Sequence, residues 1–128
     1  MMKSPNWLSK ILKEETVTST NDRLAELCQE KEIKEFTTLM AEYQTAGKGQ
    51  RGNSWESEYG KNLTFSTVFY PQTIAPASQF ILSMAVASAI FTAFAHYVPL
   101  DCLPIKWPND IYWKNKKKTG ILIVKDLK

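Results

Sequence analysis

The first half of the chain alternates between apolar and polar positions in a way that predicts two β-strands. The run 39–43 is short and mostly apolar, as is typical of a buried strand. The segment 62–70 alternates strictly, so one of its faces is apolar. We expect this face to be buried, and its members are Leu63, Phe65, Thr67 and Phe69.

Two helices are expected around these strands. A charged helical face around Leu24 and Leu27 predicts a helix that ends near Lys31. A longer helix is expected over 76–97, with its apolar positions packed on the sheet at Phe80, Met84, Ala87, Phe91, Phe94 and Val98. Two prolines and several hydroxyl residues interrupt the uncharged stretch 62–100, so we expect no membrane span there.

The last part of the chain predicts two more strands, over 103–113 and 119–124, joined by a basic turn over 114–117. At the other end, residues 6–13 are expected to form a short extended or irregular piece. These elements together predict an α/β (α+β) fold, in which a mixed β-sheet is flanked by helices.

Composition narrows the function only slightly. The 128 residues suit one domain, with 44% hydrophobic and 23% charged residues. A net charge of +3 without a basic stripe gives no reason to expect nucleic acid as a partner. Cys28 and Cys102 lack metal-ligand spacing, and no signal peptide precedes the chain, so we expect a cytoplasmic protein.

The segment 44–55 crowds glycines, cations and amides between two predicted strands. Its glycines allow backbone N–H groups to fold around an anion or to lie close to a ligand. Lys48 and Arg51 add positive charge. The spacing matches neither a phosphate-binding P-loop nor a dinucleotide fingerprint, so a flexible polar surface loop remains an alternative.

Two other segments carry polar groups in unusual places. Ser19, Thr20 and Asn21 precede a helix and exceed what an N-cap requires, although a plain cap and turn is the simpler interpretation. Lys106 lies inside an apolar strand just before Asn109 and Asp110. Since desolvating an ammonium group is costly, we expect an anion to meet it, unless the side chain reaches water at a sheet edge.

These segments together resemble the catalytic domain of biotin protein ligases. That family carries Ser-Thr-Asn before a helix, a glycine- and arginine-rich biotin loop, and Lys-Trp-Pro-Asn-Asp ahead of a Gly-Ile-Leu strand. The matching residues here are 19–21, 44–55, 106–110 and 120–123. The resemblance implies a class II aminoacyl-tRNA synthetase-like biotin/lipoate ligase fold. Residues 1–128 would be the N-terminal portion of the catalytic domain, without its C-terminal part, its small barrel or a winged helix.

The resemblance also implies a reaction. ATP, with Mg²⁺, would convert biotin to biotinyl-5′-AMP, and a lysine of a biotin carboxyl carrier protein would then accept the biotin. Lys106 and Arg51 would be catalytic, and Asp110 a metal ligand. The substrate-binding residues implied in the same way are Ser19, Thr20, Asn21, Gln44, Gly47, Lys48, Gly49, Gln50, Gly52, Trp55, Asn109 and Gly120.

The chain departs from the family pattern in its loop. Lys48, Gln50 and Asn53 stand where the family has arginines, which reduces the bidentate contacts available to phosphate. Three alternatives therefore stay open: a lipoate ligase-like enzyme, a truncated fragment that is inactive or only binds biotin, and an interaction protein. In the last case the exposed edges of an incomplete sheet would favour a homodimer.

Overall fold

The computed structural model describes residues 10–49, 52–70, 79–99, 105–106, 110–113, 116–122 and 124. The chain divides into two compact units, Met1–Pro71 and Gln72–Leu127. The single domain expected over residues 1–128 stays a prediction.

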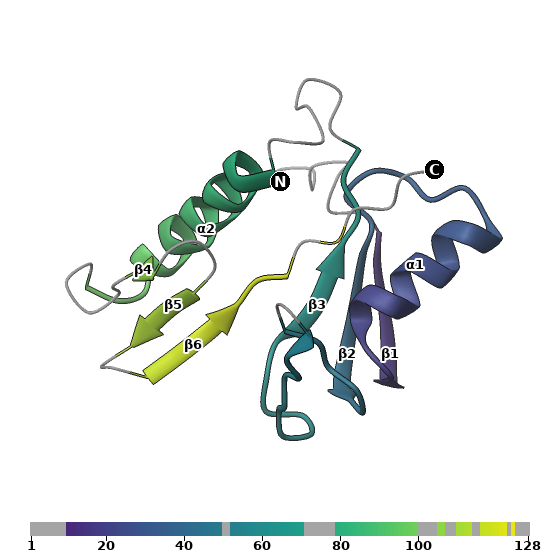
Figure 1. Cartoon of the computed structure of the whole chain (residues 1–128), viewed down its shortest axis with the longest axis horizontal. Coiled ribbons are helices and arrows are strands. Elements are labelled where there is room, and N and C mark those ends of the chain that lie inside the picture. The colour runs from purple at the N-terminus through teal and green to yellow at the C-terminus, as the bar shows by residue number, and fades with distance from the viewer. Residues whose placement is uncertain are drawn as a thin grey trace, which may run out of the picture. The chain divides into compact units, whose positions relative to one another are not determined.

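The first unit is a three-stranded sheet with one helix packed on it. The sheet has the order β1-β2-β3, with β1 parallel to β2 and β2 antiparallel to β3. Helix α1 connects the two parallel strands and lies along one face of the sheet (Figure 1). The bounds are Ile11–Val17 for β1, Thr20–Glu30 for α1, Thr38–Gln44 for β2 and Thr64–Thr67 for β3. The expected mixed sheet and its helix are confirmed.

Apolar residues of α1 and β2 form the core of this unit. Leu24 and Leu27 lie one turn apart on α1 and pack with Ile33 and with Leu39 of β2. Leu39 is completely inaccessible to solvent. Removing these side chains from water is the main favourable contribution to the packing of the helix on the sheet.

The prediction that the apolar face of β3 is buried was wrong. Leu63 and Phe65 are 73% and 48% exposed, whereas Ser66 on the opposite face is 8% exposed. The reason is that α1 packs on the polar face, where the Ser66 hydroxyl bonds Thr20 of the helix. A small hydroxyl residue lets the helix terminus approach the strand closely.

Strand β1, Ile11–Val17, extends beyond the extended or irregular piece expected over 6–13 and was not predicted as a strand. Its middle positions are charged, so the segment shows no apolar alternation. Backbone pairing with β2 nevertheless runs from Ile11 to Val17, because an edge strand can bond through its main chain while its side chains stay in water. Arg23 of α1 contacts this edge strand through an ion pair of 3.0 Å with Glu14. Each of the two side chains is 32% exposed.

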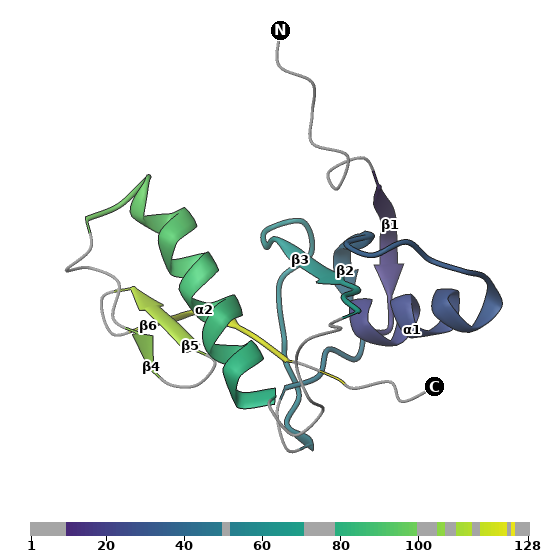
Figure 2. The same cartoon turned by 90° about the horizontal axis from the view of Figure 1, so that it is seen from above.

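The second unit consists of a helix and a three-stranded antiparallel sheet in the order β4-β5-β6, and α2 contacts β5 (Figure 2). The bounds are Gln79–Ala95 for α2, Ile105–Lys106 for β4, Asp110–Trp113 for β5 and Lys116–Gly120 for β6. The strand expected over 103–113 is thus two strands. The prediction of a basic turn over 114–117 was also wrong in part, since Lys116 and Lys117 belong to β6 and pair with Trp113 and Tyr112 of β5.

Helix α2 confirms the prediction of a long helix, although Pro76 lies outside the described residues. The expected packing positions were only partly right, because Phe80 is 60% exposed while Ser83 and Ala87 are buried. Met84 and Phe94 are exposed as well. A helix that is apolar on all sides gives no periodic signal for its buried face.

Replacing Leu39 by Ala should destabilise the first unit by about 2–5 kcal/mol, since the change leaves a cavity between α1 and the sheet. The free energy of unfolding in urea measures this loss. Leu63→Ala removes the same side chain from a position that is 73% exposed and serves as the matched control. Equal losses in the two variants would contradict the assigned core.

Candidate functional site

The three polar residues expected before the helix lie at its start, with Ser19 just before α1 and Thr20 and Asn21 in its first turn. Ser19 is the N-cap, and its hydroxyl accepts a hydrogen bond of 3.0 Å from the N–H of Asp22. Ser19 and Thr20 are 2% and 4% exposed. The simpler interpretation of Ser19 as a cap is therefore correct, and the cap places Thr20 and Asn21 where they face the sheet.

A hydrogen-bonded cluster joins this turn to two strands. Gln44, the last residue of β2, accepts a bond of 2.8 Å at Oε1 from the Thr20 N–H. The Thr20 hydroxyl lies 2.7 Å from the Ser66 hydroxyl, which in turn donates to Asn21 Oδ1. We call Thr20, Asn21, Gln44 and Ser66 the polar cluster. It unites three residues expected from the sequence with one, Ser66, that was not.

The glycine-rich segment begins at this cluster and folds as a small hairpin. Its first two residues continue the sheet, since the N–H groups of Thr45 and Ala46 donate to the carbonyls of Val17 and Thr18 at 2.9 and 2.7 Å. The hairpin closes through a bridge between Lys48 and Ser54. Its further bonds run from Gly49 N to Asn53 O at 2.6 Å and from Trp55 N to Gly47 O at 2.8 Å.

Two of the loop glycines are required by this geometry. A Cβ atom on Gly47 would lie 2.3 Å from the carbonyl oxygen of Trp55, so no side chain fits there without moving the backbone. Gly52 has a φ of +79°, in the left-handed region that favours glycine. Gln50 and Arg51 lie outside the described residues.

Lys48 is the described cation of the loop. Its Nζ forms an ion pair of 2.9 Å with the carboxylate of Asp22 in the first turn of α1. The two side chains are 57% and 42% exposed, so the pair adds little stability and can open when another anion arrives. Asp22 was not predicted as a site residue, and only its place in the first turn could have indicated it.

Three expected residues of the second unit share one row of its sheet. The register pairs Lys106 of β4 with Asp110 of β5, and Asp110 with Gly120 of β6. Because neighbouring strands lie about 4.8 Å apart, the backbones of these residues are close together. Asn109 lies outside the described residues.

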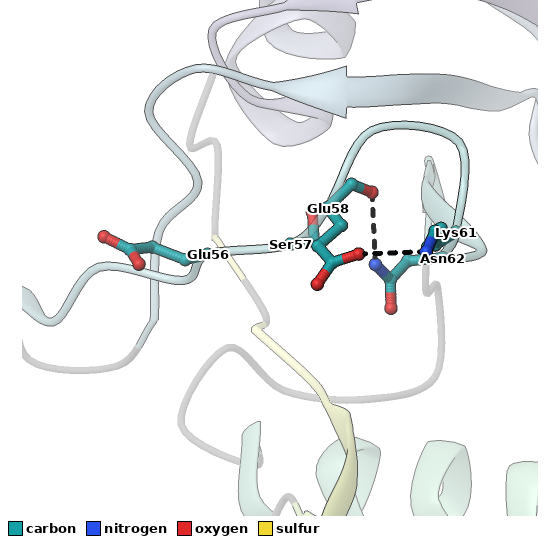
Figure 3. A pocket seen from close by; sticks show the side chains of 5 residues that line it. All are labelled: Glu56, Ser57, Glu58, Lys61 and Asn62. Carbon is teal, nitrogen blue, oxygen red and sulfur yellow. Dashed lines mark hydrogen bonds and ion pairs between the residues drawn. The ribbon is translucent and has the colours of Figure 1, made fainter.

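An open depression of the first unit lies on the segment after the hairpin (Figure 3). It has a volume of about 470 Å³ and is lined by Glu56, Ser57, Glu58, Lys61 and Asn62. An ion pair of 3.4 Å between Lys61 and Glu58 crosses it. None of the expected site residues lines this depression, so we do not identify it with the site.

Two kinds of feature are absent from the described ranges. There, no helix is long and apolar enough to cross a membrane. Within the same ranges, no group of three or more His, Cys, Asp or Glu side chains is placed to hold a metal ion. The assignment of Asp110 as a metal ligand stays a prediction.

Curated relatives of the chain are biotin ligases. It is 35% identical over 107 residues to the bifunctional ligase/repressor BirA of Escherichia coli, covering 84% of this chain and 32% of that protein. It is 33% identical over 124 residues to the human biotin–protein ligase, covering 91% and 17%. The chain thus spans about a third or less of these two relatives.

Solved structures agree with the sequence comparison. The biotin protein ligase of Leishmania major in complex with biotin matches with a TM-score of 0.76 and 28% identity, over 92% of this chain and 52% of that one. The Aquifex aeolicus enzyme in complex with biotin and ATP matches with a TM-score of 0.67 and 30% identity, over 89% and 46%. These likenesses confirm the expected fold class.

A family model matches most of the chain. The model for the biotin/lipoate A/B protein ligase family matches residues 14–126, which include the polar cluster, the hairpin and the row of Lys106, Asp110 and Gly120. The chain therefore belongs to the biotin/lipoate A/B protein ligase family.

Proposed function

We propose that the chain carries the biotin-binding part of a biotin protein ligase. In this proposal ATP activates the biotin carboxylate as biotinyl-5′-AMP, and a lysine of a biotin carboxyl carrier protein then accepts the biotin. The observation that carries the proposal is the polar cluster at the base of the glycine hairpin, in a chain of this family. Matching structures hold biotin, biotinyl-5-AMP, or biotin with ATP as ligands of those proteins.

The polar cluster suits the uncharged end of biotin. A cyclic urea has two N–H donors and one carbonyl acceptor, so it needs neutral partners of both kinds. Thr20 and Gln44 supply hydroxyl and amide groups that are already fixed by hydrogen bonds to one another. Groups held in place before binding lose little conformational entropy when the ligand arrives.

The charged end of the ligand requires cations. Both the biotin carboxylate and the phosphates of ATP are anionic, and charge develops at phosphorus during the transfer. Lys106 is the proposed central cation, and Lys48 of the hairpin is a second one. Arg51 of the loop would contribute a guanidinium group. Gly47, Gly49, Gln50 and Gly52 would supply backbone that covers the ligand, and Trp55 would supply its apolar support.

A magnesium ion would arrive with ATP. Mg²⁺ is commonly bound through one or two carboxylates together with the phosphates of the substrate, rather than by an all-protein cage. A single acidic residue such as Asp110, in register with Lys106, fits that mode. The ion would neutralise phosphate charge, and Asn109 and Gly120 would contribute to the nucleotide side of the site.

Two other functions are alternatives to the proposed one. The family also includes lipoate ligases, but the curated relatives named above are biotin ligases, which favours biotin. The chain also covers about half of the solved structures, which is compatible with a part that binds biotin without completing the reaction. A cytoplasmic location and self-association as a homodimer remain expectations from the sequence.

Isothermal titration with biotin, followed by addition of Mg-ATP and measurement of pyrophosphate, tests the proposal directly. We expect biotin to bind, with a higher affinity than lipoic acid. Pyrophosphate release would show that the 128 residues contain a working adenylation site. Binding without pyrophosphate would assign them the biotin pocket alone, and the absence of biotin binding would refute the proposed function.

Lys106→Ala should lower the rate of pyrophosphate release by about 30-fold or more, because a charge-assisted contact to the anionic groups contributes about 2 kcal/mol or more. The control is Lys61→Ala, which removes a lysine whose side chain is 75% exposed and paired with Glu58. An unchanged rate in the Lys106 variant would exclude the proposed role.

Gly47→Ala should weaken biotin binding about tenfold or more, because the added Cβ would collide with the Trp55 carbonyl and open the hairpin. Gly49→Ala is a graded comparison, since a Cβ atom there would come no closer than 3.3 Å, to Asn53 Cβ, and a small shift relieves that contact. We expect a smaller loss in that variant. Titration of both variants with biotin measures the difference, and equal affinities in both would contradict the hairpin geometry.

A further inference from the structure

The ion pair between Lys48 and Asp22 joins the glycine hairpin to the first turn of α1. Lys48 Nζ lies 3.1 Å from Asp22 Oδ1 and 2.9 Å from Oδ2, so both carboxylate oxygens contact the ammonium group. The two residues are 26 positions apart along the chain. Sequence patterns indicated the lysine but not its acidic partner, which only the folded chain brings to it.

The hairpin does not depend on this ion pair for its position. The N–H groups of Thr45 and Ala46 continue the sheet, and the Trp55 N–H donates to the Gly47 carbonyl at 2.8 Å. These bonds belong to the main chain and involve neither side chain of the ion pair. Because both of those side chains are largely exposed, the pair itself contributes little stability. Its loss should therefore leave the hairpin in place.

Asp22 is also held without the help of Lys48. Its N–H donates to the Ser19 hydroxyl at 3.0 Å, which fixes its backbone in the first turn of α1. A carboxylate in the first turn interacts favourably with the positive end of the helix dipole. The negative charge beside the hairpin is therefore a fixed feature of the helix.

A negative charge at this place competes with an anionic ligand for Lys48. A lysine ammonium is a compact point charge, and this one already contacts both oxygens of a carboxylate. An anion that binds Lys48 must displace Asp22, or share the ammonium with it and bring two negative charges close together. An uncharged ligand meets neither cost.

We propose that Asp22 is a positioning residue that acts through Lys48: it is the counter-ion of that lysine in the ligand-free protein and lowers the affinity of the site for anionic ligands relative to uncharged ones. This inference rests on the proposed function, in which the biotin carboxylate reaches Lys48. The product of the proposed reaction carries an uncharged amide in place of that carboxylate. With the product bound, Lys48 can therefore return to Asp22.

The experiment compares biotin with biotinamide, which has an uncharged amide in place of the carboxylate, by isothermal titration. Asp22→Asn should strengthen biotin binding about two- to fivefold, the range expected for an exposed ion pair, and leave biotinamide affinity unchanged. General loosening of α1 would weaken the binding of both ligands instead. Asp22→Glu keeps the charge and should restore the wild-type affinity for biotin.

A matched control and a second background test whether the effect passes through Lys48. Glu26→Gln removes an acidic charge one turn further along α1, from a side chain that is 60% exposed and paired with Arg23. It should bind biotin as the wild type does. In a Lys48→Gln background, the gain from Asp22→Asn should be smaller than in the wild type. Equal gains in the two backgrounds would overturn the action through Lys48.

Other outcomes also decide the proposal. Unchanged or weaker biotin binding in Asp22→Asn, or an equal gain for biotinamide, would overturn the counter-ion role. Thermal unfolding checks that each variant is folded, and Asp22→Ser removes the same charge if the asparagine variant does not fold. Failure of the wild-type chain to bind biotin would refute the proposed function and this inference with it, whereas biotin binding that is insensitive to Asp22 would refute this inference alone.

Discussion

The hydrogen bond from the Thr20 N–H to Gln44 Oε1 is the contact on which the arrangement of the site depends. The first turn of a helix has N–H groups without partners inside the helix, and a side chain must satisfy them when the turn is buried. Here Ser19 satisfies one as the N-cap and Gln44 satisfies another from the end of β2. The helix terminus and the start of the glycine hairpin are thereby fixed to each other.

This fixed junction also explains why the hairpin begins where it does. Once Gln44 is oriented toward the helix, the next two N–H groups continue the ladder onto Val17 and Thr18, and only then does the chain turn. The turn is tight enough that Gly47 faces the Trp55 carbonyl with no room for a side chain. The geometry of the hairpin is thus enough to require a glycine at that position.

Sequence patterns predicted the local elements better than their packing. The helix after Ser19, the strand around Leu39 and the long apolar helix α2 follow from capping and periodicity. The buried face of β3 could not be predicted, because a hydroxyl contact between Ser66 and Thr20 outweighed the apolar alternation. Strand β1 was missed for a related reason, since its pairing rests on main-chain bonds that leave no hydrophobic pattern.

In the candidate site, too, the sequence predicted the local motifs better than the contacts between them. The sequence motifs predicted Thr20, Asn21 and Gln44, but they gave no reason to expect Ser66, whose hydroxyl contacts Thr20 and Asn21 from strand β3. Neutral polar groups can be buried and satisfy one another before any ligand binds, at little cost in free energy. A cation has no such option without an anion, which agrees with the exposed pairing of Lys48 with Asp22. The neutral groups of the proposed site are therefore fixed by bonds to one another, while the exposed ion pair of Lys48 with Asp22 can exchange its partner for another anion.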